Sequence, residues 1–121
     1  MTDFARLMSD YFVKYLAGQK GSGSNTMKTY RDTFVQLLEF MDEKKHIRAD
    51  CIEVDSFSYD IINEFLEYLE KEKRVSISTR NNRLAAIRSF FKYTGYHEPK
   101  YLNISTSIRE ISKKKTEGRQ M

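Results

Sequence analysis

The sequence has few of the residues that build disulfides, metal sites and membrane spans. Its 121 residues include one cysteine, Cys51, which excludes an internal disulfide. With only His46 and His97 as further strong ligands, we expect no metal centre. No apolar run exceeds four residues, and the first residues lack the cationic and apolar blocks of a signal peptide. We therefore expect a cytoplasmic protein in which Cys51 packs at the edge of a loop.

Recognisable catalytic motifs are also missing. Gly21-Ser-Gly lacks the Lys-Ser/Thr that completes a phosphate-binding loop, and no nucleophile elbow is present. Tyrosine is abundant, but Tyr11, Tyr15, Tyr30 and Tyr68 lie on or beside apolar stripes, where aromatic residues are typical of a core. We expect no catalytic residue, no cofactor and no enzymatic activity from this chain alone.

Length and hydrophobic periodicity predict one all-α domain. A chain of 121 residues with 40% hydrophobic content can close one core but is too short for two ordinary domains. Apolar residues recur at helical spacing almost throughout, and no run alternates as a strand would. We assign the domain to residues 1–112 and a basic tail to residues 113–121.

The apolar spacing predicts five helices, the last of them the weakest. With their caps, they span about residues 3–16, 24–44, 58–73, 76–94 and 105–112. Ser24 or Asn25 is expected to cap the second helix and Ser58 the third. Gly95 is expected to end the fourth helix, and Pro99 to prevent an early restart.

Two connections are expected to lack regular structure. Residues 18–24 hold three of the five glycines, which indicates a flexible connection. Residues 46–57 carry Ile52 and Val54 in an alternating pattern, which predicts an extended tether laid on the core.

Charge is distributed unevenly along the chain. Residues 1–73 hold 10 Lys/Arg against 14 Asp/Glu, whereas residues 74–121 hold 11 against 3. A cationic surface raises the rate of encounter with a polyanion. We therefore expect nucleic acid as the partner, with an acidic membrane surface as the second possibility.

The fourth predicted helix has one apolar face and one face suited to a phosphate backbone. Ile77, Leu84, Ile87 and Phe91 share one arc, with Phe90 at its edge. Small side chains and cations on the other arc let a helix approach a duplex. That arc comprises Ser78, Asn81, Asn82, Ala85, Arg88, Ser89 and Lys92. A solvated basic face with no partner is the alternative.

The second and third helices differ in how well they suit DNA. Lys28, Thr29 and Arg31 lie in the first turns of the second helix, whereas its last turns are acidic. The third helix shows a row of carboxylates, so we expect it on the far side of the domain from DNA. These carboxylates belong to Asp60, Glu64, Glu67, Glu70 and Glu72.

The order of segments resembles the N-terminal core-binding domain of phage integrases and other tyrosine recombinases. The resemblance covers residues 3–112 and is carried by segments 26–41, 61–69 and 78–93. The last is the most specific, because it is similar to the family run Thr-x-Asn-x-Arg-Leu-x-Ala-x-Arg-x-Phe-Phe-x-Tyr. The resemblance implies a SAM-like orthogonal bundle of four to five helices, with the second and fourth helices toward the major groove of DNA.

The resemblance also implies partners and a division of labour. The partners would be double-stranded DNA and neighbouring recombinase subunits on that DNA. Away from DNA the protein would be a monomer. A C-terminal domain with a tyrosine nucleophile and a His-x-x-Arg pair would cleave the strand. Neither His46 nor His97 begins such a pair, so we expect the catalytic domain outside this chain and residues 113–121 to be an interdomain linker.

Carried over position by position, the resemblance assigns DNA contacts to twelve residues. Two assignments have structural alternatives, since Thr79 could only cap its helix and Arg83 lies near the apolar arc. The residues are Thr26, Lys28, Arg31, Ser78, Thr79, Asn82, Arg83, Arg88, Lys92, Lys113, Lys114 and Lys115.

Two other functions stay open at this point. A free-standing helical DNA-binding regulator would need no catalytic half. A SAM-like protein-interaction module would self-associate and ignore DNA.

Overall fold

A computed structural model describes residues 2–16 and 24–115 of the chain. Within these residues all regular structure is helical, which confirms the predicted all-α class. The five α-helices are α1 (Asp3–Asp10), α2 (Ser24–Lys45), α3 (Tyr59–Lys71), α4 (Ile77–His97) and α5 (Leu102–Arg109). A π-helical segment, Tyr11–Leu16, continues α1. The predicted glycine-rich connection lies outside the described residues, except for Ser24.

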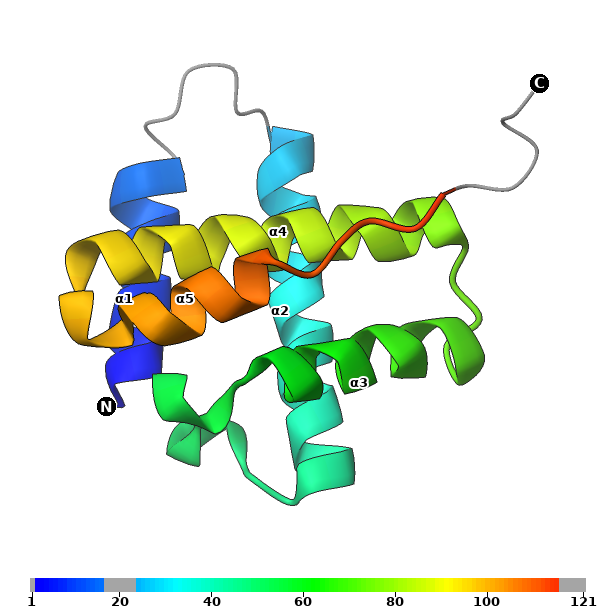
Figure 1. Cartoon of the computed structure of the whole chain (residues 1–121), viewed down its shortest axis with the longest axis horizontal. Helices are drawn as coiled ribbons and strands as arrows, with labels where there is room; N and C mark the ends of the chain where they lie inside the picture. Colours follow the sequence, from blue (N-terminus) through cyan, green and yellow to red (C-terminus); the bar gives the residue numbers. More distant parts are fainter. Residues whose placement is uncertain (1, 17–23, 116–121) are drawn as a thin grey trace.

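The helices form an orthogonal bundle. Figure 1 shows α3, α4 and α5 running along one direction, with α4 antiparallel to the other two. In the same view α1 and α2 cross this group at a steep angle. The arrangement confirms the predicted SAM-like bundle and brings the first half of α2 against α4.

The crossing is filled by an aromatic cluster centred on Phe90 of α4. The Phe90 ring lies 5.5 Å from the rings of Phe4 and Tyr11 and 5.4 Å from that of Phe34. All three contacts are edge-on, an arrangement that aromatic rings favour. Because Phe4, Tyr11 and Phe34 come from α1, the π-helical segment and α2, this one ring joins three elements.

Helix starts follow from capping side chains. The Ser58 hydroxyl accepts a hydrogen bond from the Ile61 N–H, as predicted for α3, and Ser76 does the same for α4 through the Thr79 N–H. α2 begins at Ser24, one of the two residues predicted to cap it, and Asn25, the other, already lies within the helix.

Gly95 and Pro99 act differently from the prediction. Gly95 is buried within α4, which continues to His97, so it does not end the helix. A Cβ atom at Gly95 would lie 2.6 Å from Cβ of Ser105, so glycine is needed for the close approach of α5. Pro99 begins a 3-10 turn, where its missing N–H costs nothing, and α5 follows at once, earlier than predicted.

The segment between α2 and α3 is partly as predicted. Ile52 and Val54 are fully buried against the core, but the chain forms two 3-10 turns, Ala49–Cys51 and Val54–Ser56, in place of an extended tether. Cys51 is exposed, so the packing role predicted for it is wrong.

Asp3 ties this segment to the start of α5. Its carboxylate accepts hydrogen bonds from the Val54 N–H, at 3.2 Å, and from the Tyr101 hydroxyl. Burial acts to raise the pKa of Asp3, but these hydrogen bonds outweigh it and lower the pKa. Three distant parts of the chain therefore meet at one carboxylate.

Gly95→Ala is expected to lower the free energy of unfolding by about 1 to 3 kcal/mol, as overpacking does. The added methyl group would overlap Cβ of Ser105, which rotation of the Ser105 side chain cannot move. This loss should exceed the gain of about 1 kcal/mol that alanine brings as the better helix former. Thermal unfolding followed by circular dichroism measures the change.

The control makes the same substitution in a protein that already carries Ser105→Gly. When Ser105→Gly is already present, Gly95→Ala should no longer destabilise, because the overlapping atoms are gone. A higher thermal midpoint for Gly95→Ala alone would contradict the close-approach role of Gly95.

Candidate nucleic-acid interface

A polar hollow lies between the start of α2 and the middle of α4. Its volume is about 260 Å³, and no carboxylate lines it. It brings together Thr26 and Asn82, two predicted DNA contacts that are far apart in the sequence. Ser78 lies one turn before Asn82 on α4 and is also exposed. The lining residues are Asn25, Thr26, Thr29, Tyr30, Asn82 and Ala85.

Three of the predicted cations on α2 and α4, the helices that form this hollow, are free of ion pairs with described residues. Arg31, Arg88 and Lys92 contact no carboxylate among the residues that the structure describes. Lys28 differs, because its ammonium lies 3.1 Å from the Asp32 carboxylate one turn away. That pair is exposed and therefore weak, so a phosphate could compete for Lys28.

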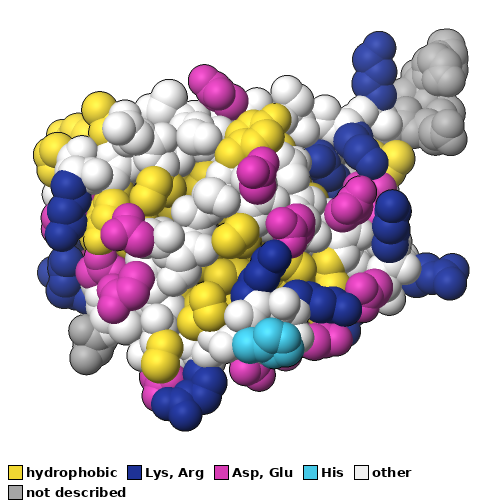
Figure 2. All heavy atoms as spheres, turned by 60° about the horizontal axis from the view of Figure 1, so that its bottom comes forward, with side chains coloured by type: hydrophobic (Ala, Val, Ile, Leu, Met, Phe, Trp, Pro, Cys, Tyr) yellow, Lys and Arg dark blue, Asp and Glu magenta, His cyan; other side chains and the backbone are white. Residues whose placement is uncertain are grey.

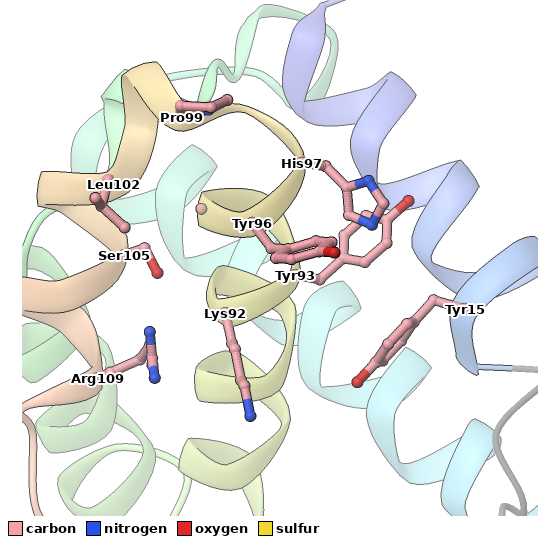
Figure 3. A pocket seen from close by; sticks show the side chains of 10 residues that line it. Tyr15, Lys92, Tyr93, Tyr96, His97, Pro99, Leu102, Ser105 and Arg109 are labelled. Carbon is pink, nitrogen blue, oxygen red and sulfur yellow. The ribbon is translucent and has the colours of Figure 1, made fainter.

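Lys92 borders a second, more apolar hollow at the end of α4. This hollow has a volume of about 580 Å³ and lies between α4, α5 and the π-helical segment. Figure 3 shows Lys92 of α4 and Arg109 of α5 at its edge, with Tyr96 and Tyr15 beside them. Arg109 was not predicted as a contact, although it is an exposed cation next to Lys92.

Arg83 has a structural role, which was the alternative to its predicted DNA contact. Its guanidinium donates to the Thr29 carbonyl at 3.3 Å and to the Thr33 hydroxyl at 3.4 Å. Both acceptors belong to α2, and Arg83 is half-buried. It therefore joins α4 to α2 beneath the polar hollow.

Fewer residues of α4 are free to contact a partner than the predicted polar arc contains. Ser89 is half-buried and shares a 2.7 Å hydrogen bond with the Tyr11 hydroxyl. Burial raises the pKa of Tyr11 to about 12, so this hydroxyl stays protonated at neutral pH. Asn81 is occupied by the main chain of Lys114. Thr79 does not cap the helix, since Ser76 has that role, and its hydroxyl accepts from Ser76 at 3.2 Å.

The three tail lysines have different surroundings. The Lys114 ammonium lies 3.0 Å from the Glu70 carboxylate of α3 and is thus partly neutralised. Lys113 and Lys115 are exposed and pair with no carboxylate among the described residues. Of the three, these two have free ammonium groups, and residues 116–121 lie outside the described part of the chain.

Arg80 is a buried cation that sequence reasoning missed. Only 5% of it is exposed, and its Nε lies 3.6 Å from the Glu70 carboxylate. Burial lowers the pKa of the Arg80 guanidinium, whereas the charge of Glu70 opposes this shift. The signal was present, because Arg80 is spaced three residues from Ile77 and four from Leu84 on the apolar arc.

The acidic helix α3 lies away from the polar hollow. In Figure 1 the start of α2 extends beyond α4 on one side and α3 lies on the other. Figure 2 shows the face on the side of α3, where cationic and acidic side chains are interspersed. Ion pairs such as Lys44 to Glu72, at 3.0 Å, account for this mixture. This face therefore presents no excess of free positive charge.

Arg83→Ala is expected to lower the free energy of unfolding by about 1 to 2 kcal/mol, because it removes the hydrogen bonds that join α4 to α2. Arg88→Ala is the matched control. It removes the same side chain from the same helix, and Arg88 has no ion pair with a described residue, so it should change stability by less than about 0.5 kcal/mol. Denaturant unfolding compares the two. Equal stability of both variants would contradict the structural position of Arg83.

None of the helices that the structure describes is long and apolar enough to cross a lipid bilayer.

Comparison with known proteins identifies the family. The family described as phage integrase, N-terminal SAM-like domain, matches residues 10–100. An integrase/recombinase of Sinorhizobium fredii, y4rC, is 33% identical over 97 residues, which cover 80% of this chain and 29% of that protein. The tyrosine recombinase XerC of Herpetosiphon aurantiacus is 36% identical over 84 residues, which cover 69% of this chain and 26% of XerC.

The chain spans less than a third of the length of these two relatives. No solved structure matches it. The family match nevertheless covers most of the bundle, including the whole of α2, α3 and α4. The chain therefore belongs to the phage integrase family of tyrosine recombinases, as an N-terminal SAM-like domain.

Proposed function

We propose that this chain binds duplex DNA at the core site of a site-specific tyrosine recombinase. The observation that carries the proposal is the polar hollow between α2 and α4, which has no carboxylate in its lining. Arg31 on α2 and Arg88 and Lys92 on α4, the two helices that form the hollow, have no ion pair with a described residue. A surface with free cations attracts phosphate.

The side chains of the hollow suit close contact with a groove. Thr26 and Ala85 are short, so the helix axes can approach the duplex. The Asn82 amide can both donate and accept a hydrogen bond, as reading of a base edge requires. The free cations of α2 and α4 would contact phosphates and fix the position of the domain without reading sequence. We therefore expect the isolated domain to bind weakly and with little sequence preference.

We assign strand cleavage to a catalytic domain outside this one. A tyrosine nucleophile must lose its proton, which requires surroundings that favour the phenolate. Burial raises the pKa of Tyr11, and the hydrogen bond to Asp3 raises that of Tyr101. Tyr11 and Tyr101 are therefore poorly suited to attack a phosphodiester. For the other tyrosines the assignment rests on the family match, which covers an N-terminal domain alone.

A second contact surface supports the proposal that neighbouring subunits pack together on DNA. An apolar groove lies between the first helical segment and α2, where Val13 is 68% exposed and Val35 49%. Three other large apolar side chains, Tyr59, Tyr96 and Leu102, are exposed elsewhere among the described residues. A patch this small suits contact between subunits that DNA already aligns, so we expect a monomer off DNA.

Affinity for a mixed-sequence duplex is expected to fall steeply with salt. If about 4 to 6 phosphates are neutralised, log affinity should fall against log salt with a slope of roughly −4 to −5. Arg88→Ala and Lys92→Ala should each weaken binding to all sequences and flatten the slope by about one unit. Fluorescence anisotropy with a labelled duplex measures both quantities.

Lys71→Ala is the matched control, because Lys71 is an exposed lysine on the acidic helix α3. It should leave affinity and slope unchanged. Binding that is insensitive to salt, or α4 variants that bind as the parent does, would contradict the proposal. Self-association without DNA binding would favour the protein-interaction module.

A further inference from the structure

The chain beyond α5 has a defined path. Figure 1 shows it returning along α4 toward the first turns of that helix. Its last backbone-to-backbone hydrogen bond in the described residues is from the Ile111 N–H to the Ile108 carbonyl. Ile111 is also the last buried residue, and residues 112–115 are exposed. Any hydrogen bond between residues 112–115 and the bundle therefore involves a side chain.

Asn81 supplies the principal contact. Its Nδ2 donates to the Lys114 carbonyl at 2.8 Å, and its Oδ1 accepts from the Lys114 N–H at 3.0 Å. One side-chain amide thus satisfies both backbone groups of one residue, as a neighbouring β-strand would. This pairing fixes which residue of the tail lies beside α4.

Arg80 holds the same segment from within the core. Its guanidinium donates to the Ser112 carbonyl at 3.1 Å and to Oδ1 of Asn81 at 3.0 Å. The second bond orients the Asn81 amide for Lys114. Since Arg80 is buried and faces Glu70, its own position is fixed by α3 and α4.

We propose that Arg80 and Asn81 form a latch that sets the direction in which the chain leaves the bundle, and that the latch opens locally without unfolding the bundle. Local opening is expected because no apolar side chain beyond Ile111 is buried in the described tail. The family places this domain at the N-terminus of its proteins, so their chains continue from this segment. The latch would thereby orient the continuing chain relative to the bundle, whether or not DNA is bound.

The two hydrogen bonds between the Asn81 amide and the Lys114 backbone, which are neutral, are the main part of the latch. The Lys114 ammonium also pairs with Glu70, but 52% of the Lys114 side chain is exposed. An exposed ion pair contributes little and is screened by salt. The latch should therefore persist at high salt and depend on Asn81 more than on the Lys114 side chain.

Amide hydrogen exchange, measured by NMR on the full 121-residue chain, tests the latch directly. The Lys114 N–H has Asn81 as its acceptor, so it should be protected in the parent. In Asn81→Ala its exchange should accelerate by about 5- to 30-fold, the factor expected from losing one or two hydrogen bonds. Core amides, such as that of Ile87, should keep their rates.

Three further variants sharpen the experiment. Asn82→Ala removes the neighbouring exposed amide and should leave Lys114 protected. Asn81→Asp keeps the acceptor for the Lys114 N–H but loses the donor, so an intermediate rate is expected. It also tests the proposal if Asn81→Ala does not fold. Lys114→Ala keeps both backbone bonds, so the amide of residue 114 should stay protected.

Several results would overturn the proposal. In the parent, exchange of the Lys114 N–H at the rate of an unstructured peptide would show that no latch exists. An equal effect of Asn82→Ala would remove the specific role of Asn81. If the core amides accelerated together with Lys114 in Asn81→Ala, the segment would open only with the whole bundle, and independent opening would be wrong.

Discussion

The structure depends on the packing of Phe90 where α1, α2 and α4 meet. Its ring contacts Phe4, Tyr11 and Phe34, one from each of three chain segments. Each buried aromatic side chain removes a large apolar area from water, and edge-on contacts add direction to that packing. The contact between Phe34 and Phe90 joins α2 to α4 where the two helices cross. The polar hollow exists because the two helices cross there, with Arg83 joining them beneath it.

Charge is arranged in two different ways on the two sides of this core. On α3 the carboxylates are matched by cations, as in the pairs of Glu64 with Lys45 and Glu67 with Lys71. On α2 and α4, Arg31, Arg88 and Lys92 have no such partner among the described residues. The positions of the free cations therefore indicate the binding side better than the net charge of +4 does. Attraction of a polyanion is expected on the side where α2 begins.

Hydrophobic periodicity predicted most of the fold, because a helix with one buried face has apolar residues at three- and four-residue spacing. It indicated the five helices and the burial of Ile52 and Val54, and a capping serine marked the start of α3 at Ser58. Gly95 was misjudged, because the rule that glycine ends helices is local, whereas its contact, Ser105, lies on another helix. The burial of Arg80 could have been predicted from its spacing on the apolar arc, but its charge partner, Glu70, lies on α3 and could not.

The candidate site was predictable in composition but only partly in geometry. Helical spacing placed Ser78, Asn82 and Lys92 on an exposed face, where the structure also has them. It could not show that Tyr11 covers Ser89 or that the returning chain occupies Asn81, because both contacts come from residues distant in sequence. DNA contact by the twelve assigned residues remains a prediction.

Chemical-shift mapping of a labelled domain titrated with a duplex tests the central claim most directly. We predict that shifts concentrate on the lining of the polar hollow and on Arg88 and Lys92, while α3 from Tyr59 to Lys71 stays unchanged. Shifts concentrated on α3, or none at a duplex concentration that saturates binding, would contradict the proposed interface.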